Sequence, residues 1–263
     1  MINRLKFLIM GRKKLQWFFD RLFRIGLRGM HYGNGAFVTR SGELCLIRKL
    51  SDLVGKKSSI LVFDVGSNDG EYARNFIENY QGSFQMHCFE PSRVAFKRLK
   101  ELLADRSNII LNNIGLGSEL SEELLYFEKE GSTIASLYKL DHVGLYASLD
   151  LSEKVQIHTL DEYCKVNNVD EIDFLKIDVE GHEVGVLLGA AKMIDKGKVR
   201  AIQFEIGPGS LYSQAYLRRF IELLPDFKIY RVLQDGLQEI IYEEMYEIFL
   251  TTNYLALRHP SKK

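Results

Sequence analysis

Short apolar runs alternate with helical segments from Ile60 to Ile206, and this alternation limits the fold more than any other feature of the chain. The runs are ILVFDV, FQMHCFE, NIILNNIGLG, VQIHTL, IDFLKIDV and VRAIQFEI. Between most of them, apolar residues recur at the spacing of a helix face. Strands that are apolar along most of their length are typical of a parallel sheet covered on both faces. We therefore predict a doubly wound α/β fold.

The C-terminal part of the sequence has a different rhythm. The segments FKIYRVL and EIFLTTNYLAL are separated by about a dozen residues, which is too short for a crossover helix. These strands are therefore expected to form an antiparallel pair that closes the sheet. The full expectation is a Rossmann-like, mostly parallel, seven-stranded sheet with an antiparallel C-terminal strand pair.

The charges balance overall but are unevenly distributed. The 263 residues include 35 Lys or Arg and 35 Asp or Glu, so no net charge steers the chain toward nucleic acid. Residues 1–30 contain only one acid, Asp20. Their basic residues are Arg4, Lys6, Arg12, Lys13, Lys14, Arg21, Arg24 and Arg28. We divide the chain into a basic helical segment with its linker, 1–36, and a main domain, 37–263.

The basic segment is predicted to form an amphipathic helix. Its apolar residues share one face, which contains Leu15, Phe18, Phe19 and Leu22. Most of its basic residues lie off that face. Such a helix either packs on the main domain or lies on an anionic membrane surface. No run is long enough to span a bilayer, and three widely spaced cysteines indicate free thiols in a reducing compartment. We expect a cytoplasmic protein, peripheral on the inner face of the membrane if the helix binds lipid.

The first apolar run ends in a glycine turn that contains acids, VFDVGSNDGEY. Its pattern is D-x-G-x-x-x-G, whereas dinucleotide sites have G-x-G-x-x-G. Asp64 and Asp69 would repel a pyrophosphate at this position. They favour a phosphate-free nucleoside with positive charge, and S-adenosylmethionine, with its sulfonium and ammonium groups, fits this description. Asp69 can also be interpreted as a cap of the following helix.

The ends of the next two strands extend the predicted nucleoside site. Glu90, at the tip of the second strand, is placed to accept hydrogen bonds from ribose hydroxyls. The small residues of NNIGLG, at the end of the third strand, would border the adenine. The expected cofactor-binding residues are Asp64, Gly66, Ser67, Asn68, Gly70, Glu90, Pro91, Asn113, Gly115 and Asp178.

Three blocks of the sequence resemble the FkbM-type S-adenosylmethionine-dependent methyltransferases. The blocks are VFDVGSNDGEY, CFEPSRVAFKRLKELL, and the stretch from IHTLDEYC through IDFLKIDVEGHEVGVLLGA to IQFEI. They lie between Leu61 and Ile206, and KIDVEGHE is the most specific part. The resemblance implies a class I methyltransferase fold and methyl transfer to oxygen, commonly on a sugar or another natural-product hydroxyl.

The candidates for chemistry lie after IDFLKI and in VRAIQFEI. An acceptor hydroxyl must be aligned with the methyl group and must lose its proton. We prefer Asp178 or His182 as the general base, with Glu180 and Glu205 orienting the acceptor. Alternatively, Asp178, Glu180 and Glu205 form an oxygen-ligand site for Mg²⁺ or Ca²⁺.

Each of these residues also has a structural interpretation. Asp178 can pair with Lys176, which points to the same face of the strand. His182 and Glu183 open a helix, where an acid complements the helix dipole. Glu205 can brace its own strand.

The segment Glu130–Asp150 is long and irregular, and loops of this kind often cover a ligand. We predict that it contributes to the acceptor site. The residues expected to face the acceptor are Ser132, Thr133, Ser136, Tyr138 and His142.

Two other functions fit parts of the sequence. An NAD-dependent oxidoreductase shares the nucleoside-binding layout, but the acids of the glycine turn oppose it. A noncatalytic nucleoside-binding module of a glycan-assembly complex would bind the cofactor without turnover. If the acceptor is a lipid-linked glycan, the basic helix would bring the enzyme to the membrane.

Overall fold

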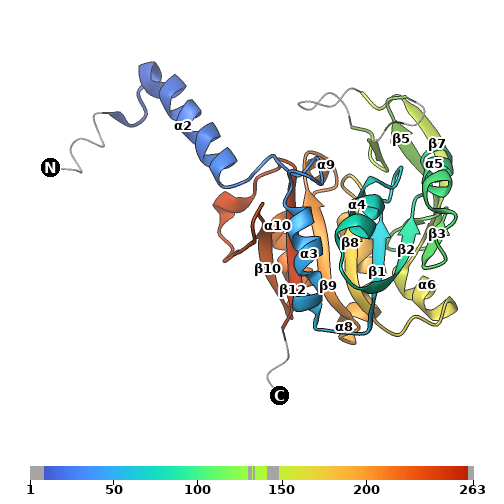
Figure 1. The fold of residues 1–263 in the computed structure, drawn as a ribbon. Coiled ribbons are helices and arrows are strands. Elements are labelled where there is room, and N and C mark those ends of the chain that lie inside the picture. The colour runs from blue at the N-terminus through green and yellow to red at the C-terminus, as the bar shows by residue number, and fades with distance from the viewer. Residues whose placement is uncertain (1–8, 130–131, 133, 141–147, 260–263) are drawn as a thin grey trace.

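An eight-stranded sheet organises the chain in a computed structural model that describes residues 9–129, 132, 134–140 and 148–259 (Figure 1). The strand order is β11-β10-β12-β9-β8-β1-β2-β3. The strands are β1 Ser59–Val65, β2 Ser83–Phe89, β3 Ile109–Asn112, β8 Ile172–Ile177, β9 Val199–Ile206, β10 Phe227–Val232, β11 Leu237–Glu239 and β12 Thr252–Arg258.

Strand directions confirm the predicted doubly wound fold. Neighbours from β3 through β2, β1 and β8 to β9 are parallel, and β12 runs antiparallel to both β9 and β10. Five of the six apolar runs and the C-terminal pair supply the predicted seven strands, and the short β11, which pairs with the edge of β10, is the eighth. The strand order changes direction at β1, where β2 and β8 lie on either side, and ligands of such sheets bind outside the carboxyl ends at this point.

The run VQIHTL belongs to a second, four-stranded sheet, so its predicted place among the parallel strands was wrong. It lies in β7 (Leu151–His158), which pairs antiparallel with β5 (Ser121–Phe127) and parallel with β4 (Gly115–Leu116). A short strand, β6 (Ala135–Ser136), completes this sheet. Buried residues alternate with more exposed ones toward the end of β7, as expected for an antiparallel strand with one solvated face.

Helices cover both faces of the main sheet. One face carries α3 (Glu43–Val54), α4 (Glu71–Asn79) and α5 (Arg93–Leu103). The other face carries α6 Leu160–Val166, α7 Glu183–Gly189, α8 Ala191–Asp195 and α10 Leu217–Leu223.

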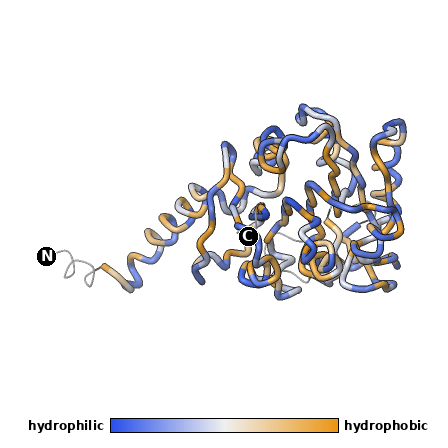
Figure 2. The backbone as a smooth tube through the Cα atoms, turned by 90° about the horizontal axis from the view of Figure 1, so that it is seen from below, coloured by the Kyte–Doolittle hydropathy of each residue, from blue (hydrophilic) through white to orange (hydrophobic). Residues whose placement is uncertain are grey.

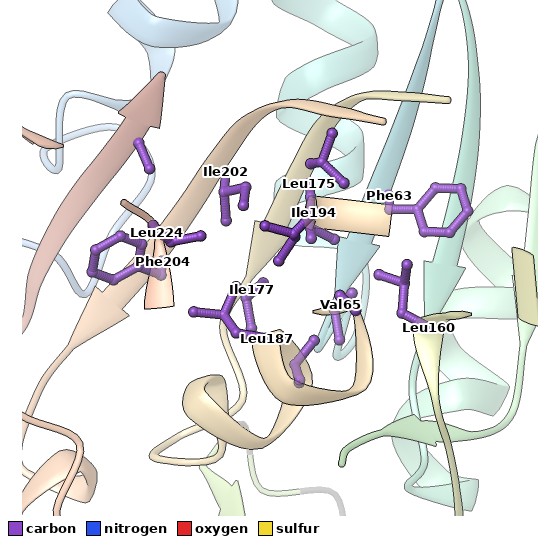
Figure 3. Packing of buried hydrophobic residues seen from close by; sticks show 14 of the residues in the cluster. Phe63, Val65, Leu160, Leu175, Ile177, Leu187, Ile194, Ile202, Phe204 and Leu224 are labelled. Atoms are coloured by element: carbon purple, nitrogen blue, oxygen red, sulfur yellow. The ribbon is translucent and has the colours of Figure 1, made fainter. Parts of the chain in front are cut away.

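Alternation along the strands divides the core into two clusters. In β1, Phe63 and Val65 point to one face, while Ile60 and Val62 point to the other. Figure 3 shows Phe63 and Val65 in the cluster that also contains Leu187 of α7. Because both faces are buried, these strands are apolar along most of their length, which is the pattern that predicted them.

The N-terminal helix α2 (Gln16–Gly29), which follows the 3₁₀ turn η1 (Lys13–Leu15), extends away from the body of the molecule (Figure 1). Leu27 is its only buried residue. The alternative in which this helix packs its apolar face on the main domain is therefore wrong. The chain then returns to the sheet, where Tyr32 is buried and the Arg231 guanidinium lies 4.5 Å from the centre of its ring.

Candidate active site

A cavity of about 450 Å³ lies at the carboxyl ends of the parallel strands. It is lined by the glycine turn after β1, by the end of β2, by residues of the turn 178–183 that follows β8 (the acidic turn), and by Glu205 of β9. The linker residues Gly35–Val38 close another side. The volume is in the range of small-molecule sites, and polar groups converge on it from several strands.

The glycine turn uses its own backbone donors. The N–H groups of Gly66 and Ser67 both donate to the carbonyl oxygen of the last residue of β2, at 3.0 Å each. The N–H of Asn68 donates to Glu90 Oε2 at 2.8 Å, and that of Gly70 donates to the Ser67 carbonyl at 2.9 Å. A pyrophosphate site needs such N–H groups to be free. This turn is therefore unsuited to a dinucleotide.

Asp64 does not line the cavity, so the expectation that it meets the cofactor was wrong. It is fully buried, and its Oδ1 lies 3.2 Å from Lys176 Nζ. The lysine also lies above the Tyr72 ring, 4.7 Å from its centre. The charge of Asp64 is thus neutralised inside the sheet, whereas Asp69 does border the cavity. The occupied N–H groups of the turn therefore disfavour a phosphate ligand more than Asp64 does.

Glu90 is the central group of the nucleoside side. Its Oε2 accepts the N–H of Asn68 and its Oε1 accepts that of Ser92, both at 2.8 Å. Burial raises the pKa of this carboxyl to about 7, although the two N–H groups oppose the shift. A carboxylate has about four lone-pair sites, so Glu90 keeps acceptor capacity toward the cavity that it lines. These residues fit a nucleoside with two adjacent hydroxyls.

The other predicted cofactor residues divide into two groups. Gly66, Ser67, Asn68, Pro91, Gly115 and Asp178 line the cavity. Gly70 lies behind the turn, where a β-carbon would come 2.9 Å from Leu102. Asn113 is exposed and does not line the cavity, because its amide donates to the carbonyls of Glu90 and Pro91 at 2.9 and 3.1 Å. Its predicted cofactor contact is replaced by a structural role.

The structure brings Asp178, Glu180 and Glu205 together at the cavity. One carboxylate oxygen of each lies within 4.8 Å of the others. The ion pair considered for Asp178 is also present, since Lys176 Nζ lies 3.3 Å from its Oδ2. Lys176 therefore links Asp64 inside the sheet to Asp178 at the cavity.

Two of these three carboxyls, Glu180 and Glu205, have raised pKa values. Burial, followed by the charges of Asp178 and Glu183, raises the pKa of Glu180 to about 8. Burial and the same kind of repulsion raise the pKa of Glu205 well above its usual value. Among the groups named here, Lys176 supplies the one positive charge near several carboxyls. A positively charged ligand would relieve this repulsion.

Glu183 holds the acidic turn through hydrogen bonds to its backbone. Its Oε1 accepts the N–H groups of Val179 and Gly181, both at 3.1 Å, and burial raises its pKa to about 7. In this turn Glu180 has a φ of 51° and Gly181 a φ of 107°. A left-handed conformation is uncommon for a residue such as Glu180 and is often found at functional sites. The structural interpretation of Glu183 at the helix start agrees with these bonds.

His182 lies at the edge of the cavity and is held by its neighbours. Its Nδ1 lies 3.1 Å from the Tyr138 hydroxyl. The ring packs against Gly117 and Gly185, because a β-carbon at either position would come within 3 Å of Nε2. Burial lowers the pKa of His182. The imidazole is therefore mostly neutral at pH 7.

Two of the residues expected to face the acceptor hold the acidic turn in place. Ser136 is fully buried and its Oγ donates to the Glu180 carbonyl at 2.7 Å, while Tyr138 contacts His182. Neither lines the cavity, so this prediction was wrong for both. Ser132 does line it. Thr133 and His142 lie outside the described residues.

Sequence reasoning missed Glu43 and the linker. Glu43 opens α3, is buried at the cavity, and accepts hydrogen bonds from Ser41 Oγ at 2.7 Å and Gln203 Nε2 at 2.6 Å. An acid at a helix start is common, so its type and position gave no signal. Its partner Gln203 lies far away in the sequence. Likewise, the composition of the linker shows a turn but not its place at the cavity.

Comparisons with known proteins identify the family of the sequence. The sequence matches the methyltransferase FkbM domain over residues 64–234. It is 26% identical over 209 residues to the 2-O-methyltransferase NoeI of Sinorhizobium fredii (strain NBRC 101917 / NGR234), covering 75% of this chain and 84% of that protein.

Two solved structures are similar at low sequence identity. One is fibrillarin from Aeropyrum pernix with bound S-adenosyl-L-methionine, with 15% identity, a TM-score of 0.43, and coverage of 82% of this chain and 73% of that chain. The other is an O-methyltransferase from Bacillus cereus in complex with SAH, with 10% identity, a TM-score of 0.42, and coverage of 97% and 96%. The family match spans more than half of the chain and includes both the glycine turn and the acidic turn. The chain therefore belongs to the FkbM methyltransferase family.

Proposed function

We propose that this methyltransferase acts on oxygen, at a hydroxyl group of a sugar or glycan. The observation that carries the proposal is the position of three carboxylates, Asp178, Glu180 and Glu205, in the same cavity as the nucleoside side formed by Glu90. In their ionised form these groups accept hydrogen bonds, so they suit an acceptor that presents several hydroxyl donors. The name of NoeI, a 2-O-methyltransferase, supports oxygen as the methylated atom.

The cofactor would lie between the glycine turn and the acidic cluster. Glu90 would bind the ribose hydroxyls, and Gly66 and Gly115 border the cavity beside it. When bound, S-adenosylmethionine supplies a methyl group on a positively charged sulfur. Burial and the neighbouring negative charges raise the pKa values of Glu180 and Glu205, so a positive charge is favoured at this place.

Glu180 is the best-placed proton acceptor for the hydroxyl. It lines the cavity, the Ser136 and Glu183 contacts fix its turn, and its pKa of about 8 is close to the working range of a general base. This assignment differs from the sequence preference for Asp178 or His182. Asp178 is already paired with Lys176, and one nitrogen of His182 is occupied by Tyr138. Asp178 and Glu205 then orient the acceptor.

A metal ion is the alternative use of the same three carboxylates. Their oxygens have the spacing and chemistry that suit Mg²⁺ or Ca²⁺, either of which would make a chelated hydroxyl more acidic. The ammonium of Lys176, 3.3 Å from Asp178 Oδ2, opposes a second cation at that oxygen. We therefore favour direct proton transfer to a carboxylate.

The test is a methyl-transfer assay with a deuterated methyl donor and a panel of nucleotide sugars and glycolipids. The expected result is a product with one labelled methyl group on a sugar oxygen, identified by mass and by NMR. Transfer to nitrogen or carbon alone would contradict the assignment of oxygen. Cofactor binding without product from any acceptor would favour the noncatalytic module, and binding of NAD in place of S-adenosylmethionine would favour the oxidoreductase.

A further inference from the structure

Helix α2 exposes a broad apolar face that nothing in the described chain covers. Phe18, Leu22 and Ile25 lie on this face and are all exposed, Ile25 at 67%. The residues lie on neighbouring turns of the helix, which gives a continuous stripe. Figure 2 shows hydrophobic and hydrophilic residues alternating along α2, well apart from the rest of the molecule. Burial of large apolar side chains contributes favourable free energy, so such a stripe marks a binding surface.

The side of α2 next to this stripe is strongly basic. Arg21, Arg24 and Arg28 form a strip there, and Asp20, which pairs with Arg24 at 2.9 Å, is the only acid of the helix. Trp17 lies within this strip, with the Arg21 guanidinium 5.6 Å from its ring. A basic strip that runs beside a stripe of Phe, Leu and Ile and contains a Trp is typical of helices that lie in a membrane interface.

The charge decides between a lipid surface and a second copy of the chain. Two paired α2 helices would bring their basic strips and the basic residues Arg12, Lys13 and Lys14 close together, and the like charges would repel. An anionic bilayer takes up the apolar stripe and neutralises the arginines at the same time. The helix lies on such a surface instead of crossing it, because no helix among the described residues is long and apolar enough to span a bilayer.

The base of α2 is fixed to the rim of the cavity. Tyr32 is buried against Arg231, and the N–H of Gly35 donates to the Thr251 carbonyl at 2.9 Å. The residues that follow, Gly35–Val38, line the cavity. A surface that binds α2 is therefore close to the cavity.

We propose that α2 docks this enzyme on an anionic lipid bilayer, with its apolar stripe among the acyl chains and its basic strip on the headgroups. The docked helix brings the cavity close to acceptors that are anchored in the membrane. This second statement rests on the proposed sugar O-methyl transfer, whereas the docking itself does not.

Co-sedimentation of the full chain with vesicles tests the docking. One set of vesicles contains phosphatidylcholine alone, and the other equal parts of phosphatidylcholine and phosphatidylglycerol. We expect binding to the anionic vesicles that weakens as salt is added. The triple variant Phe18→Ser, Leu22→Ser, Ile25→Ser removes the stripe. The variant Arg21→Glu, Arg24→Glu, Arg28→Glu reverses the charge of the basic strip. We expect each of these two triple variants to weaken binding to anionic vesicles on the order of a hundredfold.

Matched controls lie on the body of the molecule. The variant Val166→Ser, Ile241→Ser, Met245→Ser removes three exposed apolar side chains, and Lys165→Glu, Lys196→Glu, Lys198→Glu makes the same change in net charge as the arginine variant. Both controls should bind vesicles like the unaltered chain. Affinity for S-adenosylmethionine, measured by calorimetry, should be equal in all variants, which shows that the fold is intact and separates this test from that of the reaction.

Two outcomes would overturn the proposal. The first is equal binding of the unaltered chain and the α2 variants to anionic vesicles. The second is no vesicle binding together with dimerisation in analytical ultracentrifugation that the Phe18, Leu22 and Ile25 substitutions abolish. That result would assign the stripe to a second copy of the chain.

Discussion

Gly66 lies directly against the carbonyl oxygen of Asp178, and a β-carbon at position 66 would overlap that atom. The N–H of Asp178 in turn donates to the carbonyl of Val65 at 2.9 Å. The ends of β1 and β8 are therefore in backbone contact at the cavity. This contact joins the nucleoside side and the acidic turn into one rigid unit.

Gly66→Ala should break this unit. The alanine would have to adopt the left-handed φ of 83° and also displace the Asp178 carbonyl. We expect the free energy of unfolding to fall by about 3 kcal/mol, measured by urea denaturation. Gly236→Ala is the control, because no heavy atom lies within 4 Å of a β-carbon there. Equal stability of both variants would show that the strand ends separate easily.

Glu183→Gln should stabilise the protein at alkaline pH. The pKa of Glu183 in the folded state, about 7, is above the usual value of 4.5, so the folded state holds this proton more tightly than the unfolded state. Its contribution to stability is therefore full below pH 4.5 and is lost as the pH rises through about 7. Glutamine keeps Oε1 as the acceptor for Val179 and Gly181, and Oε2 has no hydrogen-bond partner to lose.

The measurement is urea unfolding of both proteins at acid and alkaline pH. We expect similar stability near pH 5 and a gain of about 2 kcal/mol for Glu183→Gln near pH 8.5. Loss of stability at both pH values would mean that the charged carboxylate is needed to hold the acidic turn.

Glu180→Gln should abolish most of the methyl transfer. As general base, Glu180 works in its ionised form, so activity should rise with pH through the pKa of about 8. We expect kcat to fall on the order of a hundredfold or more and the rising limb of the pH profile to disappear. Glu119→Gln, an exposed glutamate, is the control. If Asp178→Asn removes that limb and Glu180→Gln does not, the base is Asp178.

The parts predicted correctly depend on local pattern. Periodicity identified the parallel strands of the main sheet because each, buried on both faces, is apolar along its length. The run VQIHTL was misplaced because a short apolar run does not show which sheet it joins. Its neighbour β5 pairs with it across a long connection, which no local pattern reveals.

The parts predicted wrongly depend on contacts between distant residues. Asp64 was expected at the ligand, but Lys176 on the neighbouring strand β8 neutralises it inside the sheet. Ser136 and Tyr138 were expected at the acceptor, but they bind the Glu180 carbonyl and His182 from the second sheet. The residue types showed which interactions these side chains can make. Which partners they meet depends on the tertiary fold, because those partners lie far away in the sequence.

Glu90→Gln should weaken cofactor binding. Its two oxygens accept N–H groups from Asn68 and Ser92, and an amide in their place turns a donor toward one of these donors. With the charged acceptor for the ribose also lost, we expect affinity for S-adenosylmethionine to fall by about ten- to a hundredfold. Calorimetry measures this, and circular dichroism checks the fold. Unchanged affinity would place the ribose elsewhere in the cavity.

Removal of divalent ions decides between the two uses of the acidic cluster. Lys176 already places one positive charge 3.3 Å from Asp178, and burial together with the nearby negative charges raises the pKa values of Glu180 and Glu205, which favours neutralisation by protons. We therefore expect methyl transfer after EDTA treatment and gel filtration to stay within a few-fold of the untreated rate. If activity is lost and Mg²⁺ or Ca²⁺ restores it, the carboxylates are ligands of a metal that acidifies the hydroxyl. In that case Glu205→Ala should raise the metal concentration needed for half-maximal activity, whereas direct proton transfer predicts no metal dependence in this variant.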